Sequence, residues 1–495
     1  MVIQSIAVLG AGSAGLAAAK YAIFLLAEKK FSKIDIYEQR AVTGGVWNAS
    51  RADHEPNFTI PRTTPTKDHE YAVFPDSDTG ANGLSSHIEL VSPVYDQLET
   101  NIPFSLMNYS DFEFPADTAL FPEHQIVLAY LQQYGRAVEP LVIFETQVQD
   151  VRKVTKGQGG LESLWKVESK NLKSGTISSN FYDAVVVASG HYSDPFVPNI
   201  PGITEFNAAH PGVIMHSKFY RRPEEFSGKK VIVVGNSASG LDISSQIATA
   251  SQIPVLISEK AVSEAAAVPP SSSSTSWSRH IGEITELIPQ SRAVRLSTGA
   301  VEQGVDALIF CTGYLYSFPF LQNLNPTVIT PDGTYTEHLW QHLLYSKDPS
   351  LAFLTIPKRI VPFPLAEAQS AVVARMWAGR LPVPTETELR AWVAKRAAET
   401  TPALRHTLSY PQDRDYINNL YALCQQAKRD SSLGLENDGT GKTPPYWDEE
   451  TSWVRSNVFH IKAASRALGD RRRDCRTLAD LGFDFEASKA KNSIV

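Results

Sequence analysis

Two glycine-rich turns, each set between an apolar run and a helical run, constrain this chain more than any other feature. The first is GAGSAG at residues 10–15, directly after the apolar run Ile6–Leu9. The second is GNSASG at residues 235–240, directly after Val231–Val234. A strand, a glycine turn and a helix in this order let the backbone approach a pyrophosphate and place it at the positive end of the helix. The pattern predicts two dinucleotide sites in one chain, between which electrons can pass.

The residues after the first turn strengthen this prediction. A second strand is predicted at Ile34–Tyr37, and it ends in Glu38, an acidic residue of the type that accepts hydrogen bonds from a ribose hydroxyl. The sequence GGVW follows at residues 44–47. Two glycines let the backbone pass close to a flat ligand, and Trp47 is a candidate wall for that ligand.

Composition excludes several other classes of protein. The net charge of -7 gives no support for nucleic-acid binding. The three cysteines of the 495-residue chain form no CxxC pair, so neither a zinc site nor a disulfide framework is expected, and no metal is predicted. Neither a secretory signal nor a transmembrane segment is evident, because Lys20 and three charged residues at 28–30 interrupt and close the apolar stretch Leu16–Ala27. A cytoplasmic protein is expected.

The order of the predicted elements gives the fold class. A proline-rich linker at Asp194–Gly202 precedes a second strand–helix–strand unit at about Lys229–Ser258, and a further buried strand is predicted at Asp306–Phe310. We predict an α/β fold of two Rossmann-like dinucleotide-binding domains, the second inserted into the first, with a helical C-terminal part. The first domain takes residues 1–203 and 326–495, and the second takes 204–325. The predicted C-terminal helices include Ala366–Gly379 and Thr385–Glu399, and the predicted loops are Arg51–Asn82, Ser271–Ser276 and Lys428–Pro445.

These motifs together resemble the class B flavoprotein monooxygenases, and further residues resemble the flavin-containing monooxygenases within that class. Gly212, His216 and Tyr220 hold the spacing of the signature F-x-G-x-x-x-H-x-x-x-[YF], although His210 stands where the first Phe is usual. LETNIP at 98–103 is similar to the T-N-x-P region, and FCTGY at 310–314 to the F-A-T-G-Y element. VPFP at 361–364, continued through Gln369 and Arg375, resembles yeast and fungal members in particular.

The resemblance implies FAD in the first site and NADPH in the second. It places the residues that would hold FAD at Gly10, Gly12, Ser13, Ala14, Gly15, Glu38, Gly45, Val46 and Trp47. It places those that would hold the NADPH pyrophosphate at Gly235, Ser237, Ser239 and Gly240. Thr100 and Asn101 would lie near the flavin ring and the nicotinamide, with Asn101 as the catalytic residue. Gln369 would open a helix whose N-terminus faces the flavin ring.

The activity that the resemblance implies is FAD- and NADPH-dependent oxygenation of a nucleophilic sulfur or nitrogen centre of a small molecule, with O2 as co-substrate, through a C4a-hydroperoxyflavin. Asn101 suits this role because an amide donates and accepts hydrogen bonds without titrating. The substrate is not encoded in any short motif, and a homodimer is compatible with the resemblance. The choice of NADPH rests on the resemblance, because Glu259 and Lys260 at the end of the second unit give opposite local signals.

Four alternatives stay open at this point. Baeyer–Villiger enzymes share the two folds, but their signature ends in Trp-Pro where this chain has Tyr220-Arg221. Indole or carbon oxygenation could use the same scaffold. A disulfide reductase would need a cysteine pair beside the flavin. A non-catalytic dinucleotide sensor is disfavoured by intact glycines at both sites. His216 is interpreted either as a structural histidine or as a residue with a cofactor-linked role, which it would exert by supporting the linker.

The second glycine turn generates the first prediction. A Gly235→Val protein should keep FAD but lose reduction of the flavin by NADPH, because the branched side chain blocks the approach of the nicotinamide dinucleotide. Dithionite, which needs no binding site, should still reduce the flavin. Anaerobic absorbance spectra measure both. Loss of FAD with normal NADPH binding would show that the two turns serve the opposite cofactors.

Overall fold

A sheet built on the first apolar run forms the centre of the first nucleotide fold. The computed structural model describes residues 3–20, 31–51, 54–55, 58–67, 72–75, 86–156, 162–260 and 277–492. Seven strands pair in the order β20-β21-β22-β9-β1-β2-β5, of which β22, β9, β1, β2 and β5 run parallel. The strands are β1 (Ser5–Leu9), β2 (Lys33–Tyr37), β5 (Val142–Ile143), β9 (Ala184–Val187), β20 (Leu339–Trp340), β21 (Leu344–Tyr345) and β22 (Leu351–Phe353).

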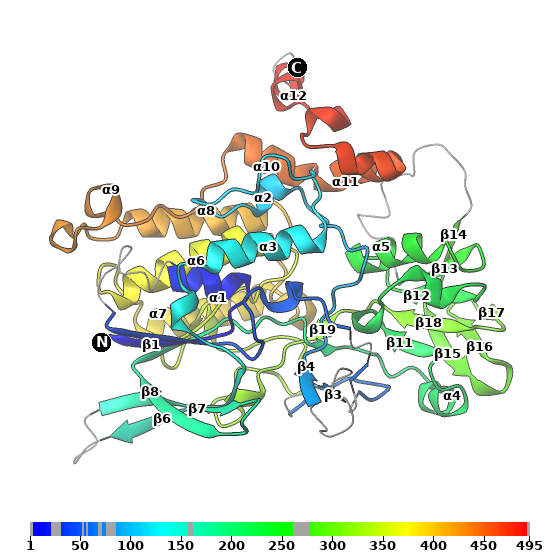
Figure 1. Cartoon of the computed structure of the whole chain (residues 1–495), viewed down its shortest axis with the longest axis horizontal. Coiled ribbons are helices and arrows are strands. Elements are labelled where there is room, and N and C mark those ends of the chain that lie inside the picture. The colour runs from blue at the N-terminus through cyan, green and yellow to red at the C-terminus, as the bar shows by residue number, and fades with distance from the viewer. Residues whose placement is uncertain are drawn as a thin grey trace.

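The alternation of side chains along β1 decides what covers each face of this sheet. Ile6 and Val8 pack with the helices on one face, whereas Ala7 and Leu9 pack with Trp165 and the strands on the other. Figure 1 shows α1, α6, α3 and α8 above β1 and the three-stranded sheet below it. The covering elements are α1 (Ser13–Ala18), α3 (His124–Gly135), α6 (Pro362–Trp377), α8 (Gln412–Gln425), β6 (Thr146–Lys156), β7 (Glu162–Asn171) and β8 (Ile177–Tyr182). Both faces are therefore buried, as continuous apolar strands require.

The second nucleotide fold is a five-stranded, wholly parallel sheet in the order β11-β18-β12-β13-β14. Its elements fall in the sequence between β9 and β20, so this fold is inserted into the first and the predicted fold class is confirmed. They are α4 (Ile203–Ala209), β11 (Ile214–His216), β12 (Val231–Val234), α5 (Ala238–Ile247), β13 (Val255–Ser258), β14 (Ser278–Ile281), β15 (Ile284–Ile288), β16 (Ala293–Leu296), β17 (Val301–Glu302) and β18 (Ala307–Phe310).

The chain enters and leaves the inserted fold through a two-stranded pairing. β10 (Asp194–Pro195) and β19 (Tyr314–Leu315) run antiparallel, so the outgoing and returning segments lie side by side. The predicted proline-rich linker thus includes one strand of this junction. The domain boundaries at 203/204 and 325/326 stay predictions.

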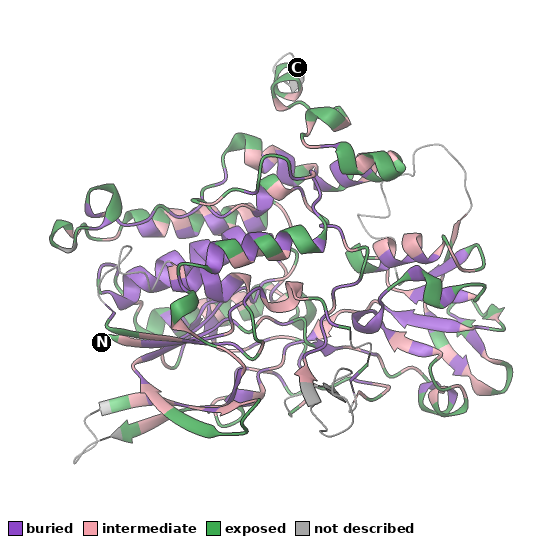
Figure 2. Cartoon of the chain, in the orientation of Figure 1, coloured by how far each residue is buried: buried purple, intermediate pink, exposed green. Residues whose placement is uncertain are grey.

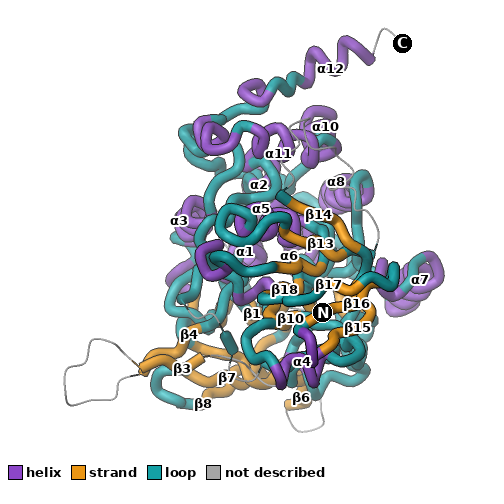
Figure 3. The backbone as a smooth tube through the Cα atoms, turned by 90° about the vertical axis from the view of Figure 1, so that its right-hand side faces the viewer, coloured by secondary structure: helices purple, strands orange, loops and turns teal. Residues whose placement is uncertain are grey.

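The C-terminal part is helical and extends beyond the sheets. Figure 3 shows α12 and the C-terminus at the opposite end of the molecule from β6 and β8. The remaining elements are β3 (Ala72–Pro75), β4 (Ser86–Glu89), α2 (Phe104–Met107), α7 (Glu386–Glu399), α9 (Glu436–Gly439), α10 (Glu449–Ser456), α11 (Val458–Ala467) and α12 (Phe485–Asn492). Among the described residues, no helix combines the length and the apolar character that crossing a membrane requires.

Helix α6 differs from its sequence prediction in where it starts. We expected Gln369 to open this helix, which is wrong, because α6 begins at Pro362 and Gln369 lies seven residues further along it, about two turns in. Prolines at 362 and 364 fit the first turn, where backbone N–H groups lack intrahelical partners in any case. The helix is buried on almost all sides, as Figure 2 shows, because it lies between the sheet and the outer helices.

The polar segment Lys428–Pro445 is more ordered than the predicted loop. It contains α9, and two buried arginines at the end of α6 hold it. Arg375 donates to the carbonyls of Thr440 and Lys442, and Arg380 donates to those of Lys428 and Thr440. Three predicted segments lie wholly or partly outside the described residues: the serine run Ser271–Ser276, about half of the excursion Arg51–Asn82, and residues 21–27 of the first helix.

Candidate functional site

The first glycine turn brings three backbone segments too close together for side chains. Gly10 follows β1 with a φ of +107°, and a Cβ on it would lie 2.7 Å from the carbonyl oxygen of Ala188. A Cβ on Gly15, in α1, would lie 1.8 Å from the carbonyl oxygen of Gly10. The glycines therefore allow α1 to start directly against the strand, with its N-terminal N–H groups free for an anion.

The second glycine turn repeats this geometry in the inserted fold. Gly235 has a φ of +106°, and a Cβ on it would lie 2.8 Å from the carbonyl oxygen of Cys311. A Cβ on Gly240 would lie 1.9 Å from the carbonyl oxygen of Gly235. Ser237 and Ser239 are exposed at the start of α5. Both turns therefore fit a dinucleotide pyrophosphate by the same backbone construction.

The position of the Glu38 side chain is fixed by a hydrogen bond from the first glycine turn. Its carboxylate is buried and accepts from the backbone N–H groups of Ala11 and Arg40, each at 2.8 Å. Burial raises the pKa of Glu38, and these two hydrogen bonds oppose that rise. The predicted contact of Glu38 with a ribose hydroxyl stays a prediction.

The GGVW segment lies against the same turn. The N–H of Gly44 donates to the carbonyl of Ala11 at 3.0 Å. Gly45 has a φ of +55°, and a Cβ on it would lie 2.8 Å from the Cα of Gly12. Backbone therefore meets backbone here, and the predicted contact of this segment with FAD stays a prediction. Trp47 is half-buried and packs against the main core, whereas Val46 presents its carbonyl to the hydroxyl of Ser92.

A loop from Ser92 to Asn101 contacts both nucleotide folds. At its start, Ser92 donates to Val46 of the first fold. Further along, the hydroxyl of Tyr95 donates to the carboxylate of Asp242 on α5, the helix of the second glycine turn. Sequence reasoning missed Ser92, Tyr95 and Asp242, because nothing in their local sequence marks partners that are up to 147 positions away.

The end of this loop is held by the C-terminal helices. Lys462 on α11 donates to the carbonyl of the buried Thr100 at 2.8 Å, and Arg472 donates to both carboxylate oxygens of Glu99 at 3.0 Å. Asn101 itself is exposed, and within the described part of the chain its amide makes no hydrogen bond. A turn closed by this amide onto the residue two positions ahead is impossible, because Pro103 has no N–H. The Asn101 amide is therefore free to meet a ligand.

Gln369 is placed differently from the other predicted residues. It is fully buried in α6, where its amide oxygen accepts from the N–H of Thr355 at 2.8 Å and its amide nitrogen donates to the hydroxyl of Tyr416 at 3.1 Å. The side chain thus braces α6 against its neighbours. Its predicted contact with the flavin stays a prediction.

The acidic residue at the end of β13 takes the place that Glu38 takes in the first fold. Glu259 contacts the amide of Asn236 within the second turn and lies 3.0 Å from Nδ1 of His280. Lys260, whose positive charge is the local signal in favour of NADPH, is largely exposed and pairs with Glu283 at 3.0 Å. The structure therefore places both an acidic residue, which favours NADH, and a basic residue, which favours NADPH, at the end of β13. It does not decide between the two cofactors.

His216 supports the junction between the two folds. It is buried, its Nε2 lies 3.0 Å from the carbonyl of Gly313 beside β19, and its Nδ1 accepts from the N–H of Lys218 at 3.1 Å. Burial lowers the pKa of His216 to about 3, so the ring is neutral. Lys218 in turn forms a buried ion pair with Glu55. These contacts fit the structural interpretation of His216, and its cofactor-linked role stays a prediction.

The three cysteines form no disulfide with one another. Cys311, Cys424 and Cys475 are free, and burial raises the pKa of the Cys311 thiol to about 12. Across the described ranges, no cluster of His, Cys, Asp or Glu is suited to hold a metal ion.

Comparison with known proteins gives one consistent family. The FMO-like family, flavin-binding monooxygenase-like, matches residues 84–265 and 279–433. The thiol-specific monooxygenase of Saccharomyces cerevisiae is 32% identical over 397 residues, 77% of this chain and 79% of that protein. FMO GS-OX5, a flavin-containing monooxygenase of Arabidopsis thaliana, is 31% identical over 433 residues, 84% of this chain and 83% of that protein. The solved structure of S-allyl-L-cysteine S-oxygenase from Allium sativum is 28% identical, has a TM-score of 0.71, and covers 99% of this chain and 98% of its own.

The contact between Gly45 and Gly12 generates a prediction for the first site. In Gly45→Ala the added methyl group should push the backbone at Gly45 away from Gly12. A displacement that costs binding about 1.4 kcal/mol is enough to weaken FAD retention about tenfold, and we expect at least this effect. Gly175→Ala is the matched control, because Gly175 has a φ of +71° with nothing within 4 Å of a Cβ. The ratio of FAD to protein after gel filtration measures the effect. Equal retention by both variants would contradict the predicted contact of this segment with FAD.

The buried amine of Lys462 generates a prediction for pH. Burial lowers its pKa to about 8 from 10.5, although Glu99 opposes this. Between these values the unfolded chain binds more protons than the folded one, so the free energy of unfolding rises with pH. The stability advantage of the wild type over Lys462→Met should therefore grow across this window, measured by denaturant unfolding at several pH values. The exposed Lys395→Met serves as control, and parallel curves for wild type and Lys462→Met would refute the shift.

Proposed function

The chain belongs to the flavin-binding monooxygenase-like family, and from that premise we propose that it oxygenates a nucleophilic sulfur centre of a small molecule. It is an enzyme of the family that uses FAD and NADPH. We propose that residues 1–203 and 326–495 hold FAD and that residues 204–325 hold NADPH. We also propose a cytoplasmic location, since cysteines that form no disulfide suit a reducing compartment. A homodimer stays a prediction.

The observation that carries the proposal is the loop that bears Asn101. It touches the GGVW segment through Ser92 and the helix of the second turn through Tyr95. A residue on such a loop is held in register with both nucleotide folds at once. This supports Asn101 as the group that meets the flavin and the nicotinamide together.

FAD, once bound and reduced by NADPH, supplies the activation of molecular oxygen. The residues of the chain then have to hold both dinucleotides, exclude water and place a hydrogen-bond donor that does not titrate. Glycine turns and Glu38 serve the first task in this proposal. The Asn101 amide serves the last, because it is exposed and makes no hydrogen bond within the described residues. No protein nucleophile or acid–base pair is required.

The choice of sulfur over nitrogen is supported by the relatives. One is named a thiol-specific monooxygenase, and another acts, by its name, on the sulfur of S-allyl-L-cysteine. Nitrogen oxygenation is the second candidate, kept because no residue of the site distinguishes the two. Cyclohexanone monooxygenase is 13% identical with a TM-score of 0.52, a likeness in fold alone. Tyr220 and Arg221, which stand in place of the Trp-Pro of ketone oxygenases, are both buried within the protein.

A substrate panel tests the reaction class. Thiols, thioethers, amines and indoles are each incubated with the FAD-loaded protein, NADPH and O2, and products are read by mass spectrometry for one added oxygen atom. We expect oxygenated thiols or thioethers. Oxygenated amines alone would replace sulfur with nitrogen, and lactones from added cyclic ketones would overturn both.

The exposed amide of Asn101 generates the sharpest prediction. Removal of one preorganised donor costs about 3 kcal/mol, or roughly 10²-fold in the step it serves. Asn101→Ala should therefore still consume NADPH but release mostly hydrogen peroxide and little oxygenated product. The measurement is the ratio of product to NADPH consumed.

Two controls make this result specific. Asn323→Ala removes an exposed asparagine that bonds Asp150 on β6 and should leave the ratio unchanged. Thermal unfolding and bound FAD show whether Asn101→Ala is folded and loaded. A wild-type ratio in folded, FAD-loaded Asn101→Ala would remove Asn101 from the mechanism.

A further inference from the structure

Two strands that lie beside the glycine turns lead into the same junction. β9 pairs in parallel with β1, so that Val187 lies in register with Leu9, the residue before the first turn. β18 pairs in parallel with β12, and Phe310 lies in register with Val234, the residue before the second turn. Ligands of parallel sheets bind outside the carboxyl ends of the strands. The segments that follow β9 and β18 therefore start at the two predicted dinucleotide sites.

These two segments each bring a tyrosine to the junction. The segment after β9 passes the first turn at Ala188 and reaches Tyr192, whereas the segment after β18 passes the second turn at Cys311 and reaches Tyr314. The antiparallel pairing of β10 and β19 then sets Tyr314 opposite Pro195. The rings of Tyr192 and Tyr314 meet edge to face, with their centres 5.6 Å apart. These two residues, the junction tyrosines, thus come one from each nucleotide fold.

Both junction tyrosines have a free hydroxyl group. Tyr192 is 42% exposed and Tyr314 is half-buried, and neither phenol makes a hydrogen bond with any residue that the structure describes. Tyr316, in contrast, donates to the carbonyl of Ile356 at 2.7 Å. Burial raises the pKa of both junction phenols, so each is protonated near pH 7 and can donate a hydrogen bond. Tyrosine hydroxyls within a protein usually have a partner, which a ligand can supply here.

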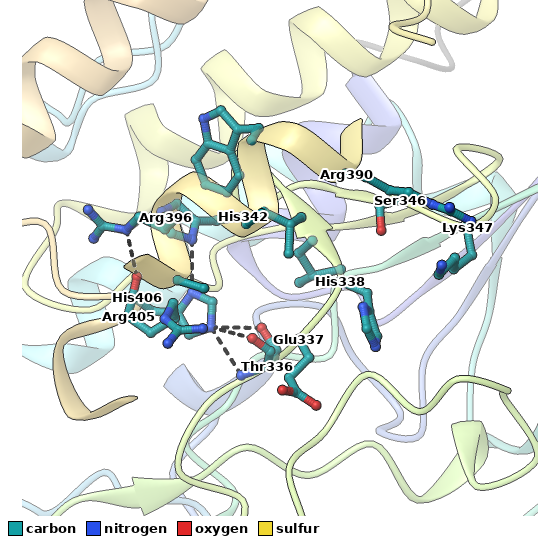
Figure 4. Close-up of a pocket in the computed structure, with 15 residues that line it drawn as sticks. Thr336, Glu337, His338, His342, Ser346, Lys347, Arg390, Arg396, Arg405 and His406 are labelled. Carbon is teal, nitrogen blue, oxygen red and sulfur yellow. Dashed lines mark hydrogen bonds between the residues drawn. The ribbon is translucent and has the colours of Figure 1, made fainter. Parts of the chain in front are cut away.

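The ring of Tyr192 is supported by a row of buried rings. His191 is buried, and its ring centre lies 4.5 Å from that of Tyr192 and 5.0 Å from that of Tyr316. Burial lowers the pKa of His191 to about 3, so this ring is neutral. Tyr316 lies 5.5 Å from His406, which lines the cavity shown in Figure 4. There Nε2 of His406 lies 3.0 Å from both the backbone nitrogen and the carbonyl oxygen of Thr336, which anchors the far end of the row.

The backbone on both sides of the junction is fixed as well. The carbonyl of Gly313, next to Tyr314, accepts from the N–H of Phe196 at 2.9 Å and lies 3.0 Å from Nε2 of His216. The carbonyl of Ser193, next to Tyr192, accepts from the buried amine of Lys218. Groups that are held in this way need little reorganisation when a ligand binds.

We propose that the junction tyrosines bind the substrate of the oxygenation reaction, and that this substrate is a small thioether. The inference rests on the proposed function, which supplies the reaction, and it adds the site that holds the substrate. Aromatic rings make favourable contacts with thioether sulfur. The two phenols can donate to a carbonyl or carboxylate oxygen of the same molecule. The pair therefore fits a thioether that carries such an acceptor group.

The test uses the full-length, FAD-loaded protein with NADPH and O2, and two probes: S-allyl-L-cysteine, which carries a carboxylate, and methyl phenyl sulfide, which carries no acceptor of this kind. Tyr192→Ala removes a ring and should raise KM for both probes about tenfold. Tyr192→Phe and Tyr314→Phe remove only a hydroxyl and should each raise KM for S-allyl-L-cysteine about fivefold, and KM for methyl phenyl sulfide less. Tyr446→Phe, at an exposed tyrosine outside the junction, should leave both values unchanged.

The outcomes separate this site from the reaction itself. If the wild type oxygenates the probes and folded Tyr192→Ala and both phenylalanine variants keep the wild-type KM, the substrate site is overturned and the proposed function stands. The two phenylalanine variants decide alone if Tyr192→Ala does not fold. Slower flavin reduction by NADPH in these variants, with KM for the probes unchanged, would place the tyrosines at the nicotinamide instead. Lack of oxygenated product from both probes in the wild type would overturn the sulfur function and this inference with it.

Discussion

The close approach of backbone to backbone at the two glycine turns is the constraint on which the rest of this structure depends. In each fold, the carbonyl of the first glycine occupies the position that a Cβ on the last glycine would need, at 1.8 Å in one fold and 1.9 Å in the other. This contact sets each helix directly on its strand and leaves the N-terminus of the helix open to an anion. In the first fold the GGVW segment adds a third backbone, because Gly45 meets Gly12. These segments therefore meet through main-chain atoms, and we expect side chains to be accepted only at positions that face away from these contacts.

Polar contacts across the junction hold the two nucleotide folds together. Tyr95 and Arg466 both bond Asp242 on the helix of the second turn, so the loop of the first fold and the C-terminal helices share one anchor there. Close to the linker, the buried pair of Lys218 and Glu55 ties the inserted fold to the first. The C-terminal helices thereby contribute to the site although they lie outside the residues that match the family. Their role is to fix the segment Glu99–Asn101, on which the oxygenation proposal rests.

Most of the fold could be predicted from sequence because it is encoded locally. The strands at Ile34–Tyr37 and Asp306–Phe310 were expected from continuous apolar runs, and the structure has strands at Lys33–Tyr37 and Ala307–Phe310. The helix at Thr385–Glu399 was also expected, and Thr385 forms a capping box with Glu388 before the helix from Glu386 to Glu399. Gln369 shows the limit of this reasoning. Its helix starts at Pro362, four residues before the predicted start at Ala366 and seven before Gln369, because proline is accepted in a first turn, where backbone N–H groups lack intrahelical partners.

The sequence by itself determined the two dinucleotide turns, the acidic residue that follows the first, and the insertion of one fold into the other. These features depend on residues close together in the chain, where glycine's freedom at positive φ and the spacing of apolar residues leave few alternatives. Only the tertiary structure decided which distant groups meet. It joined Tyr95 to Asp242 and Lys462 to Thr100. Such pairs are set by how strands and helices pack, and packing is a property of the whole chain that no short motif records.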